Sequence, residues 1–170
     1  AFDTLTAAEP FLEHIHGVGL DSGERGNPPT KFARVYARAK ELGLRAVAHA
    51  GEEGPPEYIV EALDVLGVER VDHGEAARND PALMARLAAL GIPLTMCPMS
   101  NQRLQVTPDL REHPVKLFLD AGIDVTINSD DPAYFGGYIA DNYLAVAMAL
   151  GLTADELALV AQNSLRAAWR

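Results

Sequence analysis

Residues 45–73, RAVAHAGEEGPPEYIVEALDVLGVERVDH, decide the fold of this chain. The segment opens with an apolar run, residues 45–49, after which Gly51 allows a sharp turn. A Pro-Pro pair then starts a stretch with apolar residues at helical spacing, which stops at Gly67. A second β-like run, residues 70–73, follows directly. Strand, helix and strand in this order predict a parallel βαβ unit.

The same alternation recurs along the whole chain. The runs predicted as strands are residues 15–20, 45–49, 70–73, 92–96 and 124–128. Most are short and apolar, as expected for parallel strands buried on both faces. Two helices, at about residues 138–150 and 153–168, follow the last strand, and Thr153 with Glu156 forms a capping box for the second.

The expected fold is therefore α/β with a parallel sheet. Five strands cannot close an eight-stranded barrel, so the pattern predicts either an open sheet or the last five-eighths of a barrel. The chain has 170 residues and is 48% hydrophobic, which fits one domain with a real core. No linker divides it, and residues 1–170 are predicted to form a single domain.

Composition excludes several classes of partner. A net charge of −10 and a pI near 4.8 argue against binding nucleic acid or an anionic membrane through a basic surface, but not against a neutral purine. The longest apolar stretches, such as residues 143–150, are far shorter than a membrane span. No signal-peptide pattern opens the chain. The single cysteine, Cys97, excludes internal disulfides, and we expect a cytoplasmic protein.

Polar motifs end four of the predicted strands. These motifs are His49-Ala-Gly-Glu52, Asp72-His73-Gly74, Cys97-Pro-Met-Ser-Asn101 and Asp130-Asp131-Pro132. Parallel α/β folds place their chemistry at the carboxyl ends of strands, so these side chains are expected around one mouth. Imidazole and carboxylate suit Zn²⁺ with an open position for water, and a spare glutamate suits proton transfer.

Each motif taken alone also has an ordinary structural explanation. His49 would simply close a strand, and His73 would be a core histidine satisfied by Asp72 or by backbone. The Asp-Asp-Pro sequence is good chemistry for an Asx turn or a helix N-cap. Cys97 is expected to be a small buried hydrophobic residue rather than a nucleophile. The combination of four such strand ends favours a catalytic site.

Taken together, the motifs resemble the adenosine/adenine deaminase family of metal-dependent hydrolases. The similarity to the bacterial and fungal adenine deaminase branch extends over nearly the whole chain. It is carried by the order and spacing of HAGE (49–52), DHG (72–74), CPMSN (97–101) and SDDP (129–132), and further by GLDS (19–22), EEGPP (52–56) and NSDDPAYFGGY (128–138).

This resemblance implies a (β/α)8 TIM-type barrel that uses one zinc ion to hydrolyse the 6-amino group of adenine, giving hypoxanthine and ammonia. His49 and Asp130 would be zinc ligands. Glu52 would protonate the purine ring nitrogen N1, which makes the neighbouring carbon easier to attack. His73 would orient the attacking hydroxide.

The resemblance also implies substrate contacts. Asp131 would hold the purine near N7, so that one of two adjacent acids serves the metal and the other the substrate. Ser22 or Gly23 would contact the base.

Part of the family's pattern has no counterpart here. The family's first barrel strand carries a His-x-His pair with two further zinc ligands. His14-Ile15-His16 has that spacing, but it directly precedes a segment that belongs to a middle strand of the family, so we predict a coincidental surface pair. His113, before Pro114, is predicted to be a helix-cap neighbour. The chain is thus expected to form the C-terminal portion of a deaminase barrel, whose open edges favour self-association.

Three alternatives stay open from the sequence. In the first, the substrate is adenosine or an N6-substituted adenine rather than adenine. In the second, the chain is a catalytically inactive half-barrel that binds purine or metal weakly. In the third, the protein is a different metal hydrolase built on a similar barrel.

Overall fold

The computed structural model describes residues 1–169 and contains one five-stranded parallel sheet in the order β1-β2-β3-β4-β5. All five predicted strands are confirmed, and their ends shift by no more than two residues. The strands are β1 (Gly17–Leu20), β2 (Arg45–Ala50), β3 (Arg70–His73), β4 (Leu94–Met96) and β5 (Val125–Ile127). Sequential strands are neighbours throughout, so the chain winds in one direction around the sheet.

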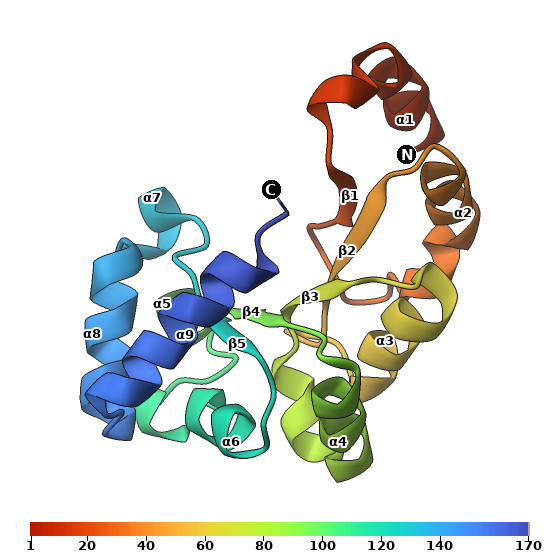
Figure 1. Cartoon of the computed structure of the whole chain (residues 1–170). Helices are drawn as coiled ribbons and strands as arrows, with labels where there is room; N and C mark the ends of the chain where they lie inside the picture. The colour runs from red at the N-terminus through yellow and green to blue at the C-terminus, as the bar shows by residue number, and fades with distance from the viewer. Residues whose placement is uncertain (170) are drawn as a thin grey trace.

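Helices connect the strands and lie around the outside of the curved sheet (Figure 1). The α-helices are α1 (Phe2–Ala8), α2 (Ala33–Glu41), α3 (Pro56–Glu61), α4 (Pro81–Leu90), α5 (Pro98–Arg103), α6 (Val115–Asp120), α7 (Pro132–Phe135), α8 (Ile139–Leu150) and α9 (Ala154–Ala167). Short helical turns are η1 (Glu9–His14), η2 (Pro29–Phe32), η3 (Ala62–Leu66), η4 (Glu75–Asn79) and η5 (Leu110–Glu112).

The helix ends follow the chemistry of the sequence. The Asp80 carboxylate accepts the backbone N–H groups of Ala82 and Leu83, both at 3.0 Å, and so caps α4. The predicted capping box is confirmed, because Thr153 and Glu156 bond to each other's backbone N–H at the start of α9.

The two faces of the sheet differ in polarity. Outward side chains such as Val71, Leu94 and Val125 are fully buried against the helices and form the main core. The inner face carries polar residues instead, among them Asp72 and Thr95, and lines a cavity of about 500 Å³. The inner face is only partly buried, unlike the expected burial on both faces, because it forms the wall of this cavity.

The C-terminal segment returns beneath the amino ends of the strands. The backbone carbonyl of Ala167 accepts a hydrogen bond from Arg70 at 2.9 Å. The guanidinium groups of Arg45 and Arg70 lie 4.4 and 4.3 Å from the ring centre of Trp169. Within residues 1–169, no helix is long and apolar enough to cross a membrane.

Candidate active site

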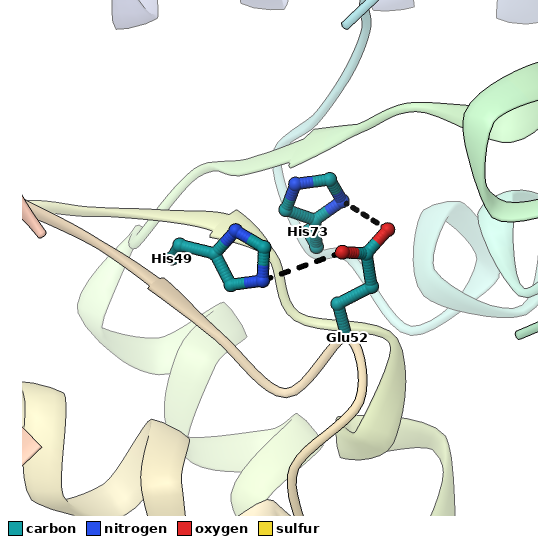
Figure 2. A group of neighbouring side chains, drawn as sticks. All are labelled: His49, Glu52 and His73. Carbon is teal, nitrogen blue, oxygen red and sulfur yellow. Dashed lines mark ion pairs between the residues drawn. The ribbon is translucent and has the colours of Figure 1, made fainter. Parts of the chain in front are cut away.

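Three predicted site residues meet where β2 and β3 end (Figure 2). Glu52 lies in the loop after β2 and bridges two imidazoles. Its Oε2 is 3.3 Å from Nε2 of His49, and its Oε1 is 3.2 Å from Nδ1 of His73. The two rings are 4.4 Å apart between centroids. Glu52 and His73 are buried and His49 is nearly so, which leaves these groups little bulk water.

The backbone around these residues is unusual. His73 and Asp130 both have left-handed conformations, with φ of 64° and 55°. Non-glycine residues adopt this region at a cost of about 1–3 kcal/mol, and they concentrate at functional sites. Gly51 also has a positive φ, and a Cβ added there would lie 2.5 Å from the side chain of Ile59. Only glycine fits this turn, which brings Glu52 back toward His49.

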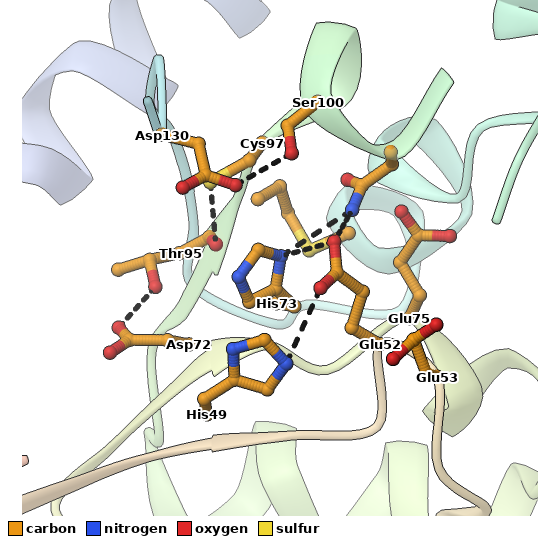
Figure 3. Close-up of polar contacts among 12 residues, drawn as sticks. His49, Glu52, Glu53, Asp72, His73, Glu75, Thr95, Cys97, Ser100 and Asp130 are labelled. Atoms are coloured by element: carbon orange, nitrogen blue, oxygen red, sulfur yellow. Dashed lines mark hydrogen bonds and ion pairs between the residues drawn. The ribbon is translucent and has the colours of Figure 1, made fainter. Parts of the chain in front are cut away.

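Asp130 approaches the same cavity from beyond β5. Its Oδ2 accepts a hydrogen bond from the buried Ser100 hydroxyl at 2.6 Å (Figure 3). Asp130, His73 and Cys97 each offer a potential metal-ligating atom within 4.8 Å of the others'. The thiol of Cys97 is buried, as expected, and burial raises its pKa far above the ordinary value. It therefore stays protonated in the absence of a metal.

Asp72 does not satisfy His73, which removes one ordinary explanation of that motif. The Asp72 carboxylate instead accepts a hydrogen bond from the Thr95 hydroxyl on the inner face of the sheet (Figure 3).

Glu24 is a site residue that the sequence analysis missed. Its buried carboxylate accepts the backbone N–H groups of Gly51, Glu52 (3.0 Å) and Glu53 (2.8 Å). Its Oε2 also lies 3.6 Å from Nε2 of His49. Burial alone would raise the pKa of Glu24, but His49 and the backbone donors outweigh it and lower the pKa to about 2. A permanent anion thus holds the loop that carries Glu52.

The environment of Glu52 favours its protonated form. Burial raises its pKa to about 7, against the opposing charge of His49. The negative charges of Asp130 and Glu75 add to the rise, whereas a hydrogen bond from Asn101 opposes it. A carboxyl that holds a proton near neutral pH is suited to general acid catalysis.

The two imidazoles shift in opposite directions. Burial lowers the pKa of His49, but the nearby carboxylates of Glu24 and Glu52 outweigh it, and the net pKa is raised. Burial, and then the positive charge of His49, lower the pKa of His73 to about 4. His73 is therefore a neutral imidazole at physiological pH.

The predicted substrate residues make none of the hydrogen bonds and ion pairs that join His49, Glu52 and His73. Asp131 is exposed and caps α7 through its backbone carbonyl, which accepts the N–H groups of Tyr134 and Phe135. Ser22 and Gly23 line a neighbouring cavity of about 440 Å³ that shares His49 with the central one. Their roles at the substrate stay predictions.

The other histidines divide into two kinds. His14 and His16 are exposed, in line with a surface pair. His113 directly precedes Pro114, the N-cap of α6, so its prediction as a helix-cap neighbour is confirmed, but its side chain also has a partner inside the protein that the sequence did not indicate. Its side chain is fully buried, and Nε2 bonds to the Asn101 side chain at 3.2 Å.

The donor set fits a metal ion. His49, Glu52 and His73 present ligand atoms within 4.8 Å of one another, and both His49 and Asp130 line the central cavity. Nε2 of His49 is buried and has no hydrogen-bond partner within residues 1–169, although two carboxylates flank it. Imidazole nitrogen and carboxylate oxygen are ordinary zinc ligands. The two predicted zinc ligands fall in different groups of potential ligands. His49 lies with Glu52 and His73, whereas Asp130 lies with His73 and Cys97.

A parallel α/β sheet that gathers imidazoles and carboxylates at the carboxyl ends of its strands places the chain among barrel-type α/β proteins. The family profile described as adenosine deaminase matches residues 4–170. The chain belongs to the adenosine deaminase family.

Within this family, the chain is similar to proteins named adenine deaminase. The chain is 60% identical over 173 residues to an adenine deaminase of Ralstonia nicotianae, covering 99% of this chain and 50% of the relative. It is 59% identical to an adenine deaminase of Streptomyces coelicolor, with the same coverage. The chain thus spans about half the length of the curated relatives that it matches.

Solved structures agree with the fold. The crystal structure of adenine deaminase from Arthrobacter aurescens superposes with a TM-score of 0.94 at 49% identity, covering 99% of this chain and 51% of that one. An amidohydrolase from Burkholderia ambifaria, solved with bound zinc, gives 0.87 at 29% identity, covering 99% and 49%. The chain therefore has the architecture of an incomplete TIM-type barrel.

Proposed function

We propose that the protein containing this chain hydrolyses adenine to hypoxanthine and ammonia with the help of one zinc ion. The observation that carries the proposal is Glu52, a buried carboxyl between two imidazoles whose pKa is raised to about 7. Relatives named adenine deaminase, at about 60% identity, support the choice of substrate.

The residues of this chain divide the chemistry between them. Glu52 donates its proton to ring nitrogen N1 of the purine, which draws electrons from C6 and makes that carbon electrophilic. Neutral His73, beside Glu52, accepts a hydrogen bond from the attacking water and orients it. The water oxygen adds to C6 as one of its protons passes to His73, and that proton then moves to the amino group. The C6–N bond breaks, ammonia leaves, and the remaining hydroxyl proton returns to Glu52 as the C6 carbonyl forms.

His49 and Asp130 would hold the metal ion. When bound, zinc lowers the pKa of a bound water toward neutrality. The hydrogen bond from Ser100 orients the Asp130 carboxylate, and Glu24 lies beside His49. Asp131 and one of Ser22 and Gly23 would contact the base.

A matched pair of neighbouring glutamates tests the proposal in the full-length protein. Glu52→Gln removes the transferable proton and keeps the shape, so we expect kcat for ammonia release from adenine to fall about 10²- to 10⁴-fold. Glu53→Gln makes the same change in an exposed side chain paired with Arg25, and we expect activity within about twofold of the wild type.

Adenosine and N6-methyladenine are assayed in parallel, with zinc content measured for each protein. Faster turnover of either compound than of adenine would replace the substrate assignment. Wild-type protein with neither zinc nor ammonia release would leave only a binding role. We also infer a reducing compartment such as the cytoplasm, because the single cysteine is a buried free thiol.

A further inference from the structure

A second group of buried polar side chains lies behind Glu52. Glu75 is 1% exposed, Asn101 is fully buried and His113 is 3% exposed. They come from η4, from α5 and from the segment before α6, so only the fold brings them together. Glu52 and Glu75 are both drawn in Figure 3. The chemistry described above uses none of the three.

These residues form a continuous chain of contacts that ends on Glu52. Nδ2 of Asn101 donates to Oε1 of Glu52 at 2.6 Å. Oδ1 of the same amide accepts from Nε2 of His113 at 3.2 Å. Oε1 of Glu75 lies 3.2 Å from that ring nitrogen. At the far end, the Thr107 hydroxyl donates to Oε2 of Glu75 at 2.6 Å.

This series of side-chain contacts determines the orientation of the Asn101 amide. An amide has one donor end and one acceptor end, and turning it over would set its oxygen against the Glu52 carboxylate. The hydrogen on Nε2 of His113 opposes this, because turning the amide over would also set its NH2 group against that N–H. Nδ1 of His113 is buried without a partner within residues 1–169. An unpaired acceptor there costs less than an unpaired N–H, and the anion of Glu75 favours a hydrogen on Nε2.

We propose that Glu75, His113 and Asn101 are positioning residues that fix the orientation of the Glu52 carboxyl, with Oε1 bonded to Asn101 and Oε2 left to exchange a proton with the substrate. This inference rests on the proposed function of Glu52. Oε2 is the oxygen on the His49 side, whereas Oε1 already receives the Asn101 amide. Without the contacts to His113 and Glu75, the Asn101 amide can turn over, and the Glu52 carboxyl loses its single orientation.

The test uses the full-length, zinc-loaded protein and two substitutions of one residue. His113→Phe keeps the ring volume and removes the donor, whereas His113→Gln keeps an N–H at similar reach. We expect His113→Phe to lower kcat for adenine about 10- to 100-fold, as small misplacements of catalytic groups do, with KM and zinc content within about twofold. His113→Gln is expected to restore most of the loss. His14→Phe makes the same change on an exposed side chain and is expected to behave as wild type.

Nitrogen-15 NMR of the histidine rings gives a readout that does not depend on activity. We expect wild-type His113 to carry a hydrogen on Nε2. A hydrogen on Nδ1 instead, unchanged kcat in His113→Phe, or equal losses in both His113 variants would each overturn the inference. Wild-type protein that releases no ammonia from adenine would refute the proposed function. The spectrum of the His113 ring would still decide the orientation of the Asn101 amide.

Discussion

Replacement of Glu24 by glutamine is the sharpest physical test of how the loop carrying Glu52 is held. Glu24→Gln keeps the size of the side chain and removes the negative charge that three backbone N–H groups and His49 surround. An amide nitrogen would then face some of those donors, and it offers them no acceptor.

The expected loss follows from the pKa of Glu24. The drop from 4.5 to about 2 corresponds to about 3 kcal/mol of folding free energy at pH 7, since one pKa unit is worth about 1.36 kcal/mol. The folded-state pKa lies below the unfolded one, so this stabilisation is present above pH 4.5 and is lost as the pH falls toward 2. At pH 3 less than half of it remains.

Urea denaturation of the metal-free, full-length protein measures this difference. Wild type and Glu24→Gln are compared between pH 7 and pH 3, with Glu53→Gln as a control on the same loop. We expect a difference of about 3 kcal/mol at pH 7 that shrinks by more than half at pH 3, with unchanged denaturant slopes. A gap independent of pH, or an equal loss in the control, would refute the electrostatic reasoning.

Three further outcomes are expected. Ser100→Ala removes the hydroxyl that orients Asp130, and zinc affinity measured by chelator competition should fall about 10- to 100-fold; an unchanged affinity would exclude Asp130 as an oriented ligand. Gly51→Ala forces a Cβ against Ile59 at a positive φ and should destabilise by more than Gly91→Ala, which has a similar φ and open space; equal melting temperatures would contradict the crowding. The isolated 170-residue chain, which ends its sheet in the open strands β1 and β5, should self-associate with rising concentration in analytical ultracentrifugation, and a monomer at all concentrations would refute this.

Local sequence patterns determined most of the fold. Short apolar runs between proline and glycine signals located all five strands, because helix starts, helix stops and buried strands each require particular residue types. The capping residue Thr153 was identified for the same reason. Strand ends were less accurate, since the last residues of a strand depend on hydrogen bonds to its neighbour.

The central cluster was also accessible from the sequence. His49, Glu52 and His73 follow strands that are adjacent in both sequence and space, so the parallel topology alone brings them together. The left-handed backbone at His73 and Asp130 had no clear sequence signal, because neither residue is a glycine.

The sequence by itself thus determined the order of strands and helices and the acid between two imidazoles. Only the tertiary structure decided which other polar residues serve that acid. Glu24, Glu75 and His113 look like surface residues in the sequence, because ionisable side chains are rarely buried. Each is buried here because partners from distant segments satisfy its hydrogen bonds, and those partners meet only once the sheet has curled and its helices have packed.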